Sequence, residues 1–220
     1  MTEPARSPAR ADGTRLILAR HGQTASNIAR VLDSLPPGPP LNPLGQAQAA
    51  ALGERLATEA ITVVHASTAI RAQQTAAPVA AAHGLTVDVV EGVHEVFCGD
   101  LEGRADEEAR ERFDEIYRSW WQGDLDAHLP GGESALDLRA RFLPVVERIT
   151  SDVAGTVVLV SHGAAIRVVA GALLGETVET LYVPNTGLVV MTAEGVGWTL
   201  EHWDTAPPVV GDVTAGGPPD

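Results

Sequence analysis

One apolar run, Val-Val-Leu-Val at residues 157–160, limits the folds open to this chain more than any other stretch. It lies between Thr156 and Ser161, and its length and composition predict a short strand that is buried on both faces. A strand of this kind belongs in the interior of a parallel sheet. Such a sheet needs helices on both of its faces, because neither face can be left in water.

Other apolar runs predict further strands, at residues 15–19, 61–66, 86–90, 188–192 and 198–203. Helical patterns lie between most of them, at residues 43–60, within 67–83, at 104–121, from 134 to about 153, and at 164–174. Asn42 before Pro43 is a helix start, and Ser134 with Asp137 resembles a capping box. This alternation predicts an α/β fold, a three-layer sandwich in which a mostly parallel central sheet carries helices on both faces.

We expect a single domain at residues 14–205, because a chain of 220 residues can bury a substantial core. Residues 1–13 and 206–220 lack apolar periodicity and are rich in Pro, Ala and Gly, which predicts disordered segments. Residues at about 104–128 are expected to form a helical insertion within this domain. Its aromatic side chains recur at helical spacing, and we interpret that stripe as core.

The formal net charge of −14 excludes two classes of partner, nucleic acid and anionic membranes, which both require basic patches. No apolar run is long enough to cross a bilayer, and residues 1–13 lack the apolar core of a signal peptide, so we expect a cytoplasmic protein. The single cysteine, Cys98, has no cationic neighbour in the sequence to stabilise a thiolate and is interpreted as structural.

Polar residues follow three of the predicted strands at the point where each strand ends. Arg20 and His21 follow the first, Ser67 leads to Arg71 after the second, and His162 follows the strand at 156–160. Parallel strands place these ends on one edge of the sheet, where ligands of α/β proteins bind. The helix that begins after Gly163 also favours anions at its N-terminus. In a chain this acidic, the convergence of two arginines and two histidines predicts a phosphate pocket.

The residue types at this edge suit phosphoryl chemistry. A neutral imidazole such as His21 can attack phosphorus, and the planar donors of Arg20 can hold the phosphoryl oxygens. Taken alone, the motif allows another interpretation, in which Arg20 is a surface charge and His21 a turn residue. His162 taken alone would be a buried structural histidine. The three strand ends together favour a site.

An ordered set of motifs resembles the histidine phosphatase superfamily, also called phosphoglycerate mutase-like. The matching residues, in family order, are Arg20-His21-Gly22 with Thr24 and Asn27, residues 41–46 with Gln48-Ala49, residues 67–76, Glu95 with Gly99, Glu102 and Gly103, residues 131–134, Ser161-His162-Gly163, and Asn185-Thr186-Gly187. They cover residues 16 to about 190.

The resemblance implies a role for each residue of the pocket. His21 would attack phosphorus and become phosphohistidine, and Glu95 would donate the proton to the leaving group. The phosphoryl oxygens would be bound by Arg20, Arg71, His162 and Asn27, with His162 counted as catalytic as well. Candidates for the pocket wall are Gln23, Thr24, Thr186 and Gly187. No metal and no cofactor is implied.

Phosphatase is the function we favour, acting on a small phosphorylated metabolite. The chain is less elaborated than the cofactor-dependent mutases, particularly at 104–128. A phosphoglycerate mutase that uses the same phosphohistidine is an alternative, as is a non-catalytic module that binds a phospho-ligand; a metallohydrolase built on the two histidines is the weakest. We expect specificity from the helix at 104–121 and the proline-rich loop at 31–40. Whether that loop closes over the site, which substrate is used and the oligomeric state stay open.

Overall fold

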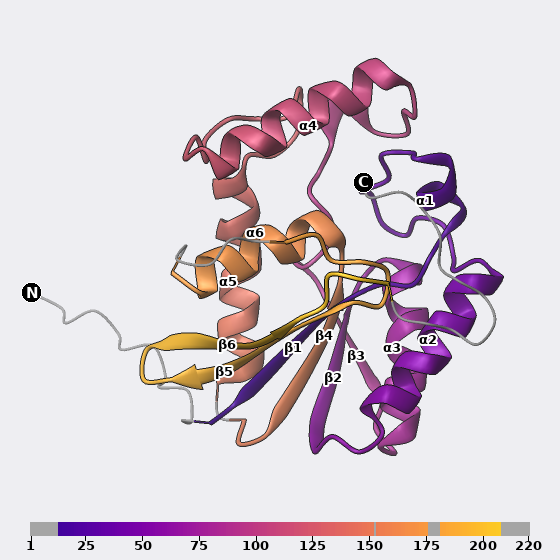
Figure 1. The fold of residues 1–220 in the computed structure, drawn as a ribbon, viewed down its shortest axis with the longest axis vertical. Coiled ribbons are helices and arrows are strands. Elements are labelled where there is room, and N and C mark those ends of the chain that lie inside the picture. Colours follow the sequence, from indigo (N-terminus) through magenta and orange to yellow (C-terminus); the bar gives the residue numbers. More distant parts are fainter. Residues whose placement is uncertain (1–12, 152, 176–180, 208–220) are drawn as a thin grey trace, which may run out of the picture.

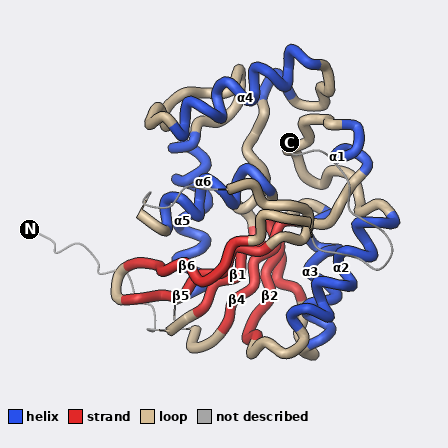
Figure 2. Tube along the Cα trace, viewed as in Figure 1, coloured by secondary structure: helices blue, strands red, loops and turns tan. Residues whose placement is uncertain are grey.

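The computed structural model describes residues 13–151, 153–175 and 181–207 (Figures 1 and 2). Within them lies a six-stranded sheet with the order β3-β2-β4-β1-β5-β6. Its strands are β1 (Arg15–Arg20), β2 (Ile61–Ser67), β3 (Val87–Val90), β4 (Thr156–Ser161), β5 (Leu188–Glu194) and β6 (Gly197–Trp203). The segments predicted to be disordered fall almost entirely outside the described residues.

The first four strands are parallel, and the β5–β6 hairpin extends the sheet in the antiparallel sense. β4, the run that constrains the fold, is buried along its whole length between β1 and β2. Its register pairs Ser161 with Arg20, so the polar ends of β1 and β4 are level. The mostly parallel α/β sheet predicted from the sequence is confirmed.

Helices cover both faces of the sheet (Figure 1). They are α1 (Ala25–Ala29), α2 (Pro43–Leu56), α3 (Ile70–Ala82), α4 (Glu107–Trp121), α5 (Ala135–Thr150) and α6 (Gly163–Leu173), with a short 3-10 turn, η1 (Gly99–Leu101). Successive residues of β1 face opposite layers, because strand side chains alternate. Leu16 and Leu18 pack in the cluster with α5 and α6, whereas Ile17 and Ala19 pack in the cluster with α2 and α3.

Local capping explains where two helices begin. The Asn42 side chain accepts a hydrogen bond from the backbone N–H of Gly45, and Pro43 is the first residue of α2. Ser134 and Asp137 form a reciprocal capping box at the start of α5. Both starts were predicted from the sequence. The short α1 was not, because it has five residues, none of them buried, and therefore no apolar pattern.

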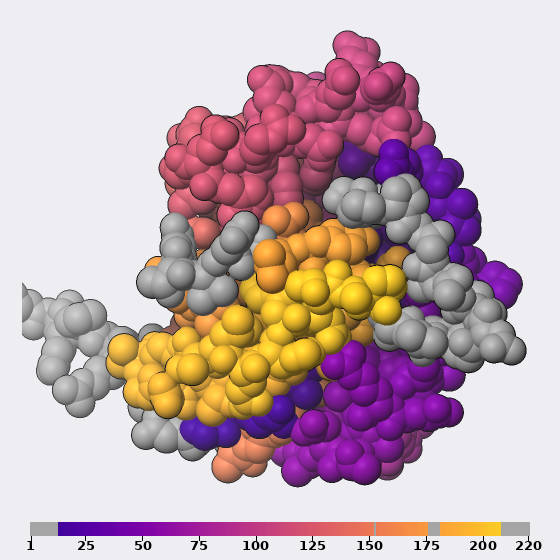
Figure 3. Space-filling view, in the orientation of Figure 1, coloured from indigo at the N-terminus to yellow at the C-terminus, as the bar shows by residue number. Residues whose placement is uncertain are grey.

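α4 and its flanking loops lie beyond the carboxyl edge of the sheet and cover one end of the molecule (Figure 3). Tyr117 and Trp120 are buried, and both belong to the main core cluster, as the sequence predicted for this aromatic stripe. Trp121 keeps 37% of its surface exposed. No helix in the described part of the chain is long and apolar enough to cross a membrane.

A close backbone approach holds the loop after β1 against the start of α2. A Cβ added to Gly45 would overlap the carbonyl oxygen of Gln23, and one added to Gly22 would lie 2.6 Å from the carbonyl oxygen of Gly45. The segment that carries His21 is therefore fixed by contact with α2.

Gly45→Ala tests this contact. In an open helix, alanine stabilises relative to glycine. Here we expect the free energy of unfolding to fall by about 1–3 kcal/mol, the usual cost of overpacking. Gly197→Ala is the control, because its nearest neighbour, the Glu194 oxygen, is 3.9 Å away. Urea unfolding that shows Gly45→Ala to be as stable as the wild type would contradict the contact.

Candidate active site

The polar strand ends meet beside one cavity of about 400 Å³. Arg20 and His21 lie at the end of β1, Arg71 in the first turn of α3, and Glu95 in the loop after β3; all four line the cavity. The elements that carry these residues therefore meet at one place, as the sequence predicted. His162 does not line the cavity. It is fully buried beside His21, with the two ring centroids 5.1 Å apart.

The ring of His21 is held in one tautomer. Its Nδ1 lies 2.8 Å from the carbonyl oxygen of Gly22, which can only accept, so Nδ1 carries the proton and Nε2 keeps its lone pair. Burial, followed by the positive charges of Arg71 and Arg20, holds the pKa of His21 well below its usual range. The imidazole is therefore neutral at neutral pH, the form that a nucleophile requires.

Several elements fix the backbone of His21. Its N–H donates to the Ser161 carbonyl (3.0 Å), and its own carbonyl accepts from the side-chain amide of Asn185 (2.9 Å). The next N–H, of Gly22, donates to the Thr75 hydroxyl (2.9 Å), which in turn donates to the carbonyl of Arg71 (2.7 Å). Thr75 thus couples the histidine loop to the arginine at the start of α3.

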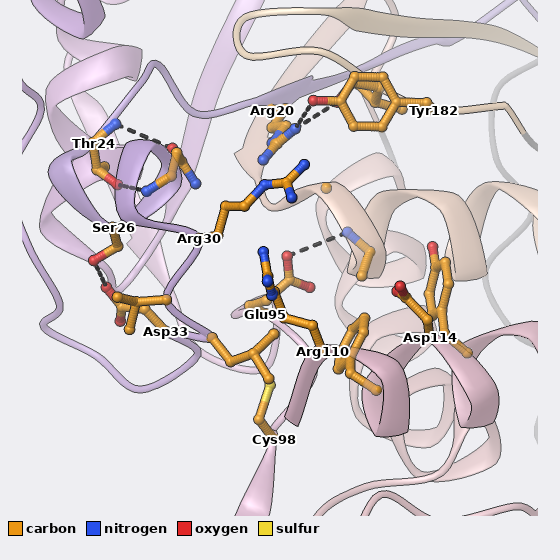
Figure 4. Close-up of a pocket in the computed structure, with 18 of the residues that line it drawn as sticks. Arg20, Thr24, Ser26, Arg30, Asp33, Glu95, Cys98, Arg110, Asp114 and Tyr182 are labelled. Atoms are coloured by element: carbon orange, nitrogen blue, oxygen red, sulfur yellow. Dashed lines mark hydrogen bonds between the residues drawn. The ribbon is translucent and has the colours of Figure 1, made fainter. Parts of the chain in front are cut away.

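The two arginines are anchored differently. Nη1 of Arg20 donates to the Tyr182 hydroxyl (2.8 Å) and to the Val183 carbonyl (3.0 Å) (Figure 4). Nη2 of Arg71 donates to the backbone carbonyl of Asp33 (2.9 Å), and its Nη1 lies 3.7 Å from the Asp33 carboxylate. That Nη1 is buried and makes no hydrogen bond within the described residues. It is a donor in position for a ligand oxygen.

His162 has one partnered and one unpartnered ring nitrogen. Nε2 lies 3.0 Å from the Ser67 hydroxyl, and the buried Nδ1 has no hydrogen-bond partner among the described residues. Burial, then the charge of Arg71 and the neighbouring His21, hold the pKa of His162 well below its usual range. Two neutral imidazoles therefore lie together at the end of the sheet.

Glu95 is fixed by the start of α6. Its carboxylate accepts hydrogen bonds from the backbone N–H groups of Ala164 (3.2 Å) and Ala165 (2.8 Å), and from that of Val96 (2.9 Å) (Figure 4). Backbone N–H groups at a helix start favour a negative partner. The sequence predicts that this helix start attracts an anion; within the protein, that anion is the Glu95 side chain.

The proline-rich loop at 31–40 is held as a wall of the cavity. The Glu102 carboxylate accepts from the backbone N–H groups of Ser34 (3.0 Å) and Leu35 (3.2 Å) and from the Ser34 hydroxyl. Leu32 and Asp33, from the same loop, line the cavity, and Asp33 also accepts from the Ser26 hydroxyl (2.9 Å). Through Asp33, the loop fixes Arg71.

Asn27 and Thr24 line the cavity as a capping box at the start of α1. Oδ1 of Asn27 accepts from the Thr24 N–H (3.1 Å) and from the Asn185 side chain (3.3 Å), so only its amide NH₂ is left for a ligand.

Three candidates for the pocket wall do not line the cavity, and we correct their placement. Oε1 of Gln23 accepts from the Asn42 side chain (2.9 Å), which ties it to α2. The N–H of Thr186 donates to the Arg20 carbonyl (3.0 Å), and the Gly187 carbonyl accepts from the Arg20 N–H (3.0 Å). Thr186 and Gly187 therefore hold the backbone of Arg20.

Other lining residues were not identified from the sequence as part of the site. They include Arg30, Arg110, Arg167, Phe113, Tyr117 and Tyr182. The aromatic stripe with Phe113 and Tyr117 was interpreted as core, although specificity was expected from the same helix, and both residues line the cavity. Cys98 lines it too; burial raises the pKa of its thiol to about 12, which agrees with a structural role.

Comparison with known proteins identifies the family. The model of the histidine phosphatase superfamily (branch 1) matches residues 16–206. The chain belongs to the histidine phosphatase superfamily. A 2,3-bisphosphoglycerate-dependent phosphoglycerate mutase of Methylobacterium sp. is 35% identical over 174 residues, which cover 76% of this chain and 83% of the mutase.

Solved phosphatase structures of this family share the fold. A mycobacterial glucosyl-3-phosphoglycerate phosphatase has a TM-score of 0.73 at 28% identity, over 90% of this chain and all of the other. A putative alpha-ribazole-5'-P phosphatase from Escherichia coli has a TM-score of 0.73 at 26% identity, over the same shares of the two chains. Both phosphatases and mutases are therefore among its relatives.

The buried imidazoles predict a pH-dependent stability. The pKa of His21 and of His162 is depressed in the folded state, whereas a histidine of the unfolded chain has a pKa of about 6.5. Below that pH, the unfolded chain therefore binds more protons than the folded protein. The contribution of these two histidines to the free energy of unfolding is therefore complete above that pH and decreases as the pH falls. His162→Gln lacks one of these two imidazoles. As the pH falls from 6.5 to 5, we therefore expect its free energy of unfolding to decrease by up to ~2 kcal/mol less than that of the wild type. Urea unfolding across this range measures it.

The control for that experiment is Leu52→Ala, which removes buried apolar contacts of α2 without removing a titratable group. Its curve should run parallel to that of the wild type. A His162→Gln curve that is also parallel would contradict the buried neutral imidazole.

The loop wall gives a second prediction. Glu102→Ala releases Ser34 and Leu35, and with them the position of Asp33 and Arg71. We expect the Kd for inorganic phosphate, measured by calorimetry, to rise about tenfold, or ~1.4 kcal/mol. Glu108→Ala is the matched control, because Glu108 pairs only with Arg104 among its described contacts and is largely exposed. Equal Kd values for the two variants would show that the hydrogen bonds of Glu102 to Ser34 and Leu35 do not position Arg71.

Proposed function

We propose that this protein is a metal-independent phosphomonoesterase that hydrolyses a small phosphorylated metabolite through a phosphohistidine at His21. The hydrogen bond from Nδ1 of His21 to the Gly22 carbonyl carries the proposal, because it leaves an unprotonated Nε2 in a cavity lined by Arg20 and Arg71. An imidazole in this tautomer, next to donors for phosphoryl oxygens, suits in-line attack on phosphorus.

In the first step, the Nε2 lone pair of His21 would form the N–P bond while the bond from phosphorus to the leaving oxygen breaks. The guanidinium groups of Arg20 and Arg71 would stabilise the charge on the equatorial oxygens. The side-chain amide of Asn27 would add a neutral donor. These groups are in place before substrate arrives, which is the condition for strong electrostatic stabilisation.

His162 would act as a further donor to the phosphoryl group. The Ser67 hydroxyl can donate to Nε2, which places the proton on the unpartnered Nδ1. This Nδ1–H would be a neutral hydrogen-bond donor for a phosphoryl group carried by the neighbouring His21.

Glu95 would move the protons. As the acid it gives a proton to the leaving alkoxide, and as the carboxylate it then takes one from the water that attacks phosphorus. The N–P bond breaks in that second step, so inorganic phosphate leaves and neutral His21 returns. The hydrogen bonds from α6 fix the carboxylate at the cavity wall and favour its charged form, so they support the proton-accepting step.

A phosphoglycerate mutase is the second candidate, favoured by the 35% identical Methylobacterium mutase. The two reactions share the phosphohistidine and differ in whether water or product accepts the phosphoryl group. The phosphatases among the similar structures favour hydrolysis. A non-catalytic binding module is the weaker reading, because Glu95 lies in the cavity with His21.

Trapping the intermediate tests the proposal. Wild-type protein quenched during turnover of a ³²P-labelled phosphomonoester should carry an acid-labile, alkali-stable phosphoryl group, which His21→Ala lacks. Wild-type protein that turns over substrate with no such label would sink the mechanism. ³¹P NMR with 3-phosphoglycerate separates the two enzymes: inorganic phosphate indicates a phosphatase, and 2-phosphoglycerate a mutase.

The same assay tests Glu95 as the acid. Glu95→Gln should lose about 10²–10⁴-fold in kcat with an alkyl phosphate, the usual worth of general acid catalysis. The loss should be much smaller with p-nitrophenyl phosphate, whose leaving group departs as a stable anion. Glu91→Gln, an exposed residue of the same loop, is the control. Equal losses of Glu95→Gln on both substrates would contradict the assignment.

A further inference from the structure

Glu95 lies in a loop, residues 91–98, that joins β3 to η1 and contains no helix or strand. The hydrogen bonds from α6 hold its carboxylate but not the backbone that carries it. A general acid has to stay within hydrogen-bond reach of the leaving oxygen, so whatever fixes this backbone bears on the chemistry. Two residues outside the cavity do so: Arg141 on α5 and Glu133, which lies just before α5.

Arg141 gathers three carbonyl groups of the loop. Its Nη1 donates to the carbonyls of Gly92 (2.9 Å) and His94 (3.0 Å), and its Nη2 donates to that of Glu95 itself (2.8 Å). Nε and Nη2 also donate to the two carboxylate oxygens of Glu133, at 2.7 and 2.9 Å. These bonds use all the N–H donors that a guanidinium possesses. One side chain therefore fixes the loop on both sides of the acid.

Glu133 connects this guanidinium to the later part of the loop. Its Oε2 also accepts from the Phe97 N–H (2.9 Å), and its own N–H donates to the Phe97 carbonyl (3.0 Å). Gly132 permits this approach, because a Cβ there would overlap the Phe97 carbonyl oxygen. The turn at residues 131–134 is one of the motifs that resemble the family, and the proposed phosphoryl transfer gives it no part.

The pair of Arg141 and Glu133 is largely shielded from water. Their side chains keep only 18% and 17% of their surface exposed. Burial raises the pKa of Glu133, but the hydrogen bonds from Arg141 and from the Phe97 N–H outweigh it and hold that pKa below its usual range. The carboxylate is therefore charged at neutral pH. Bidentate hydrogen bonds between two charged groups are strong and fix the orientation of both.

Further contacts hold the same loop against the scaffold. A Cβ added to Gly92, whose φ is 86°, would lie 3.0 Å from both the Arg141 carbonyl oxygen and the Val145 side chain. The Ser161 hydroxyl at the end of β4 donates to the Val93 carbonyl (2.7 Å). α5 and β4 thus fix the backbone of the loop, while α6 receives the carboxylate at its tip.

We propose that Arg141, together with Glu133, is a positioning residue for proton transfer, which fixes the backbone of Glu95 so that its carboxylate stays at the start of α6. Neither residue lines the cavity, so both act through Glu95. This inference rests on the proposed function, in which Glu95 is the acid. The hold on the loop is present whether or not substrate is turned over.

The dependence on the leaving group tests the proposal. Arg141→Met keeps the apolar stem and removes every donor. Its kcat/KM, which covers phosphoryl transfer to His21, should fall about 10- to 100-fold more for glycerol 3-phosphate than for p-nitrophenyl phosphate, whose leaving group needs no proton. Arg148→Met, exposed two turns further along α5, is the matched control and should keep the wild-type ratio of the two values. An unchanged ratio in Arg141→Met overturns the proposal, because a general structural defect lowers both values equally.

Two more variants sharpen this test. If Arg141 acts through Glu95, adding Arg141→Met to Glu95→Gln should lower kcat/KM for glycerol 3-phosphate by less than about threefold. Fully additive losses would contradict the proposal. Arg141→Lys covers the case in which Arg141→Met does not fold, because an ammonium keeps the charge and some donors but lacks the planar fork. Its ratio should change in the same direction by a smaller factor, and a wild-type ratio would count against the proposal.

Amide hydrogen exchange followed by NMR separates this proposal from the proposed function. First-turn N–H groups lack acceptors within their helix, so protection of the Ala164 and Ala165 amides reports their bonds to the Glu95 carboxylate. In Arg141→Met both should exchange about tenfold faster or more. The Ile166 amide, which donates to the N-cap carbonyl of α6, should keep its rate.

The two readouts have distinct outcomes. Faster exchange at residues 164 and 165 in a protein that hydrolyses no phosphomonoester would support the hold on Glu95 and would be a failure of the proposed function alone. Unchanged exchange at both residues would overturn the positioning role, even in a protein that proves to be a phosphatase.

Discussion

The parallel pairing of β1 with β4 is the interaction on which the rest of the site depends. It places Arg20 opposite Ser161, so the residues that follow these strands, His21 and His162, leave the sheet at the same level. Both strands are buried on both faces, which makes their register costly to change. If β1 and β4 were not neighbours in the sheet, the two imidazoles would be separated even with unchanged loops.

Much of this arrangement was predictable because it follows from local patterns. The apolar run at 157–160 predicts a doubly covered parallel sheet, and polar residues at three strand ends predict where ligands bind. The convergence of Arg20, His21 and Arg71 follows from those two points. Capping at Asn42 and Ser134 is equally local, since each cap bonds a residue three positions away.

Other features depend on contacts between distant segments and leave no pattern in the sequence. Gln23 lies next to the motif, yet its side chain turns to Asn42, the N-cap of α2. Arg110 is one of several arginines in a charged helix, and only the packing of α4 over the sheet edge shows which one faces the cavity. Arg30 has no signal at all, because a left-handed arginine is not encoded by any turn motif.

The carboxylate of Glu95 is bonded to the first turn of the helix that follows His162, and this has a consequence for how the site can diversify. Glu95 is thereby tied to the same piece of the scaffold as His162, which is anchored in the sheet through β4. α4 approaches from outside this piece and contributes the outer wall. Changes in α4 can therefore alter the shape of the cavity while the spacing between His21 and Glu95 is preserved, so the outer wall can diverge in evolution independently of the residues at the sheet edge.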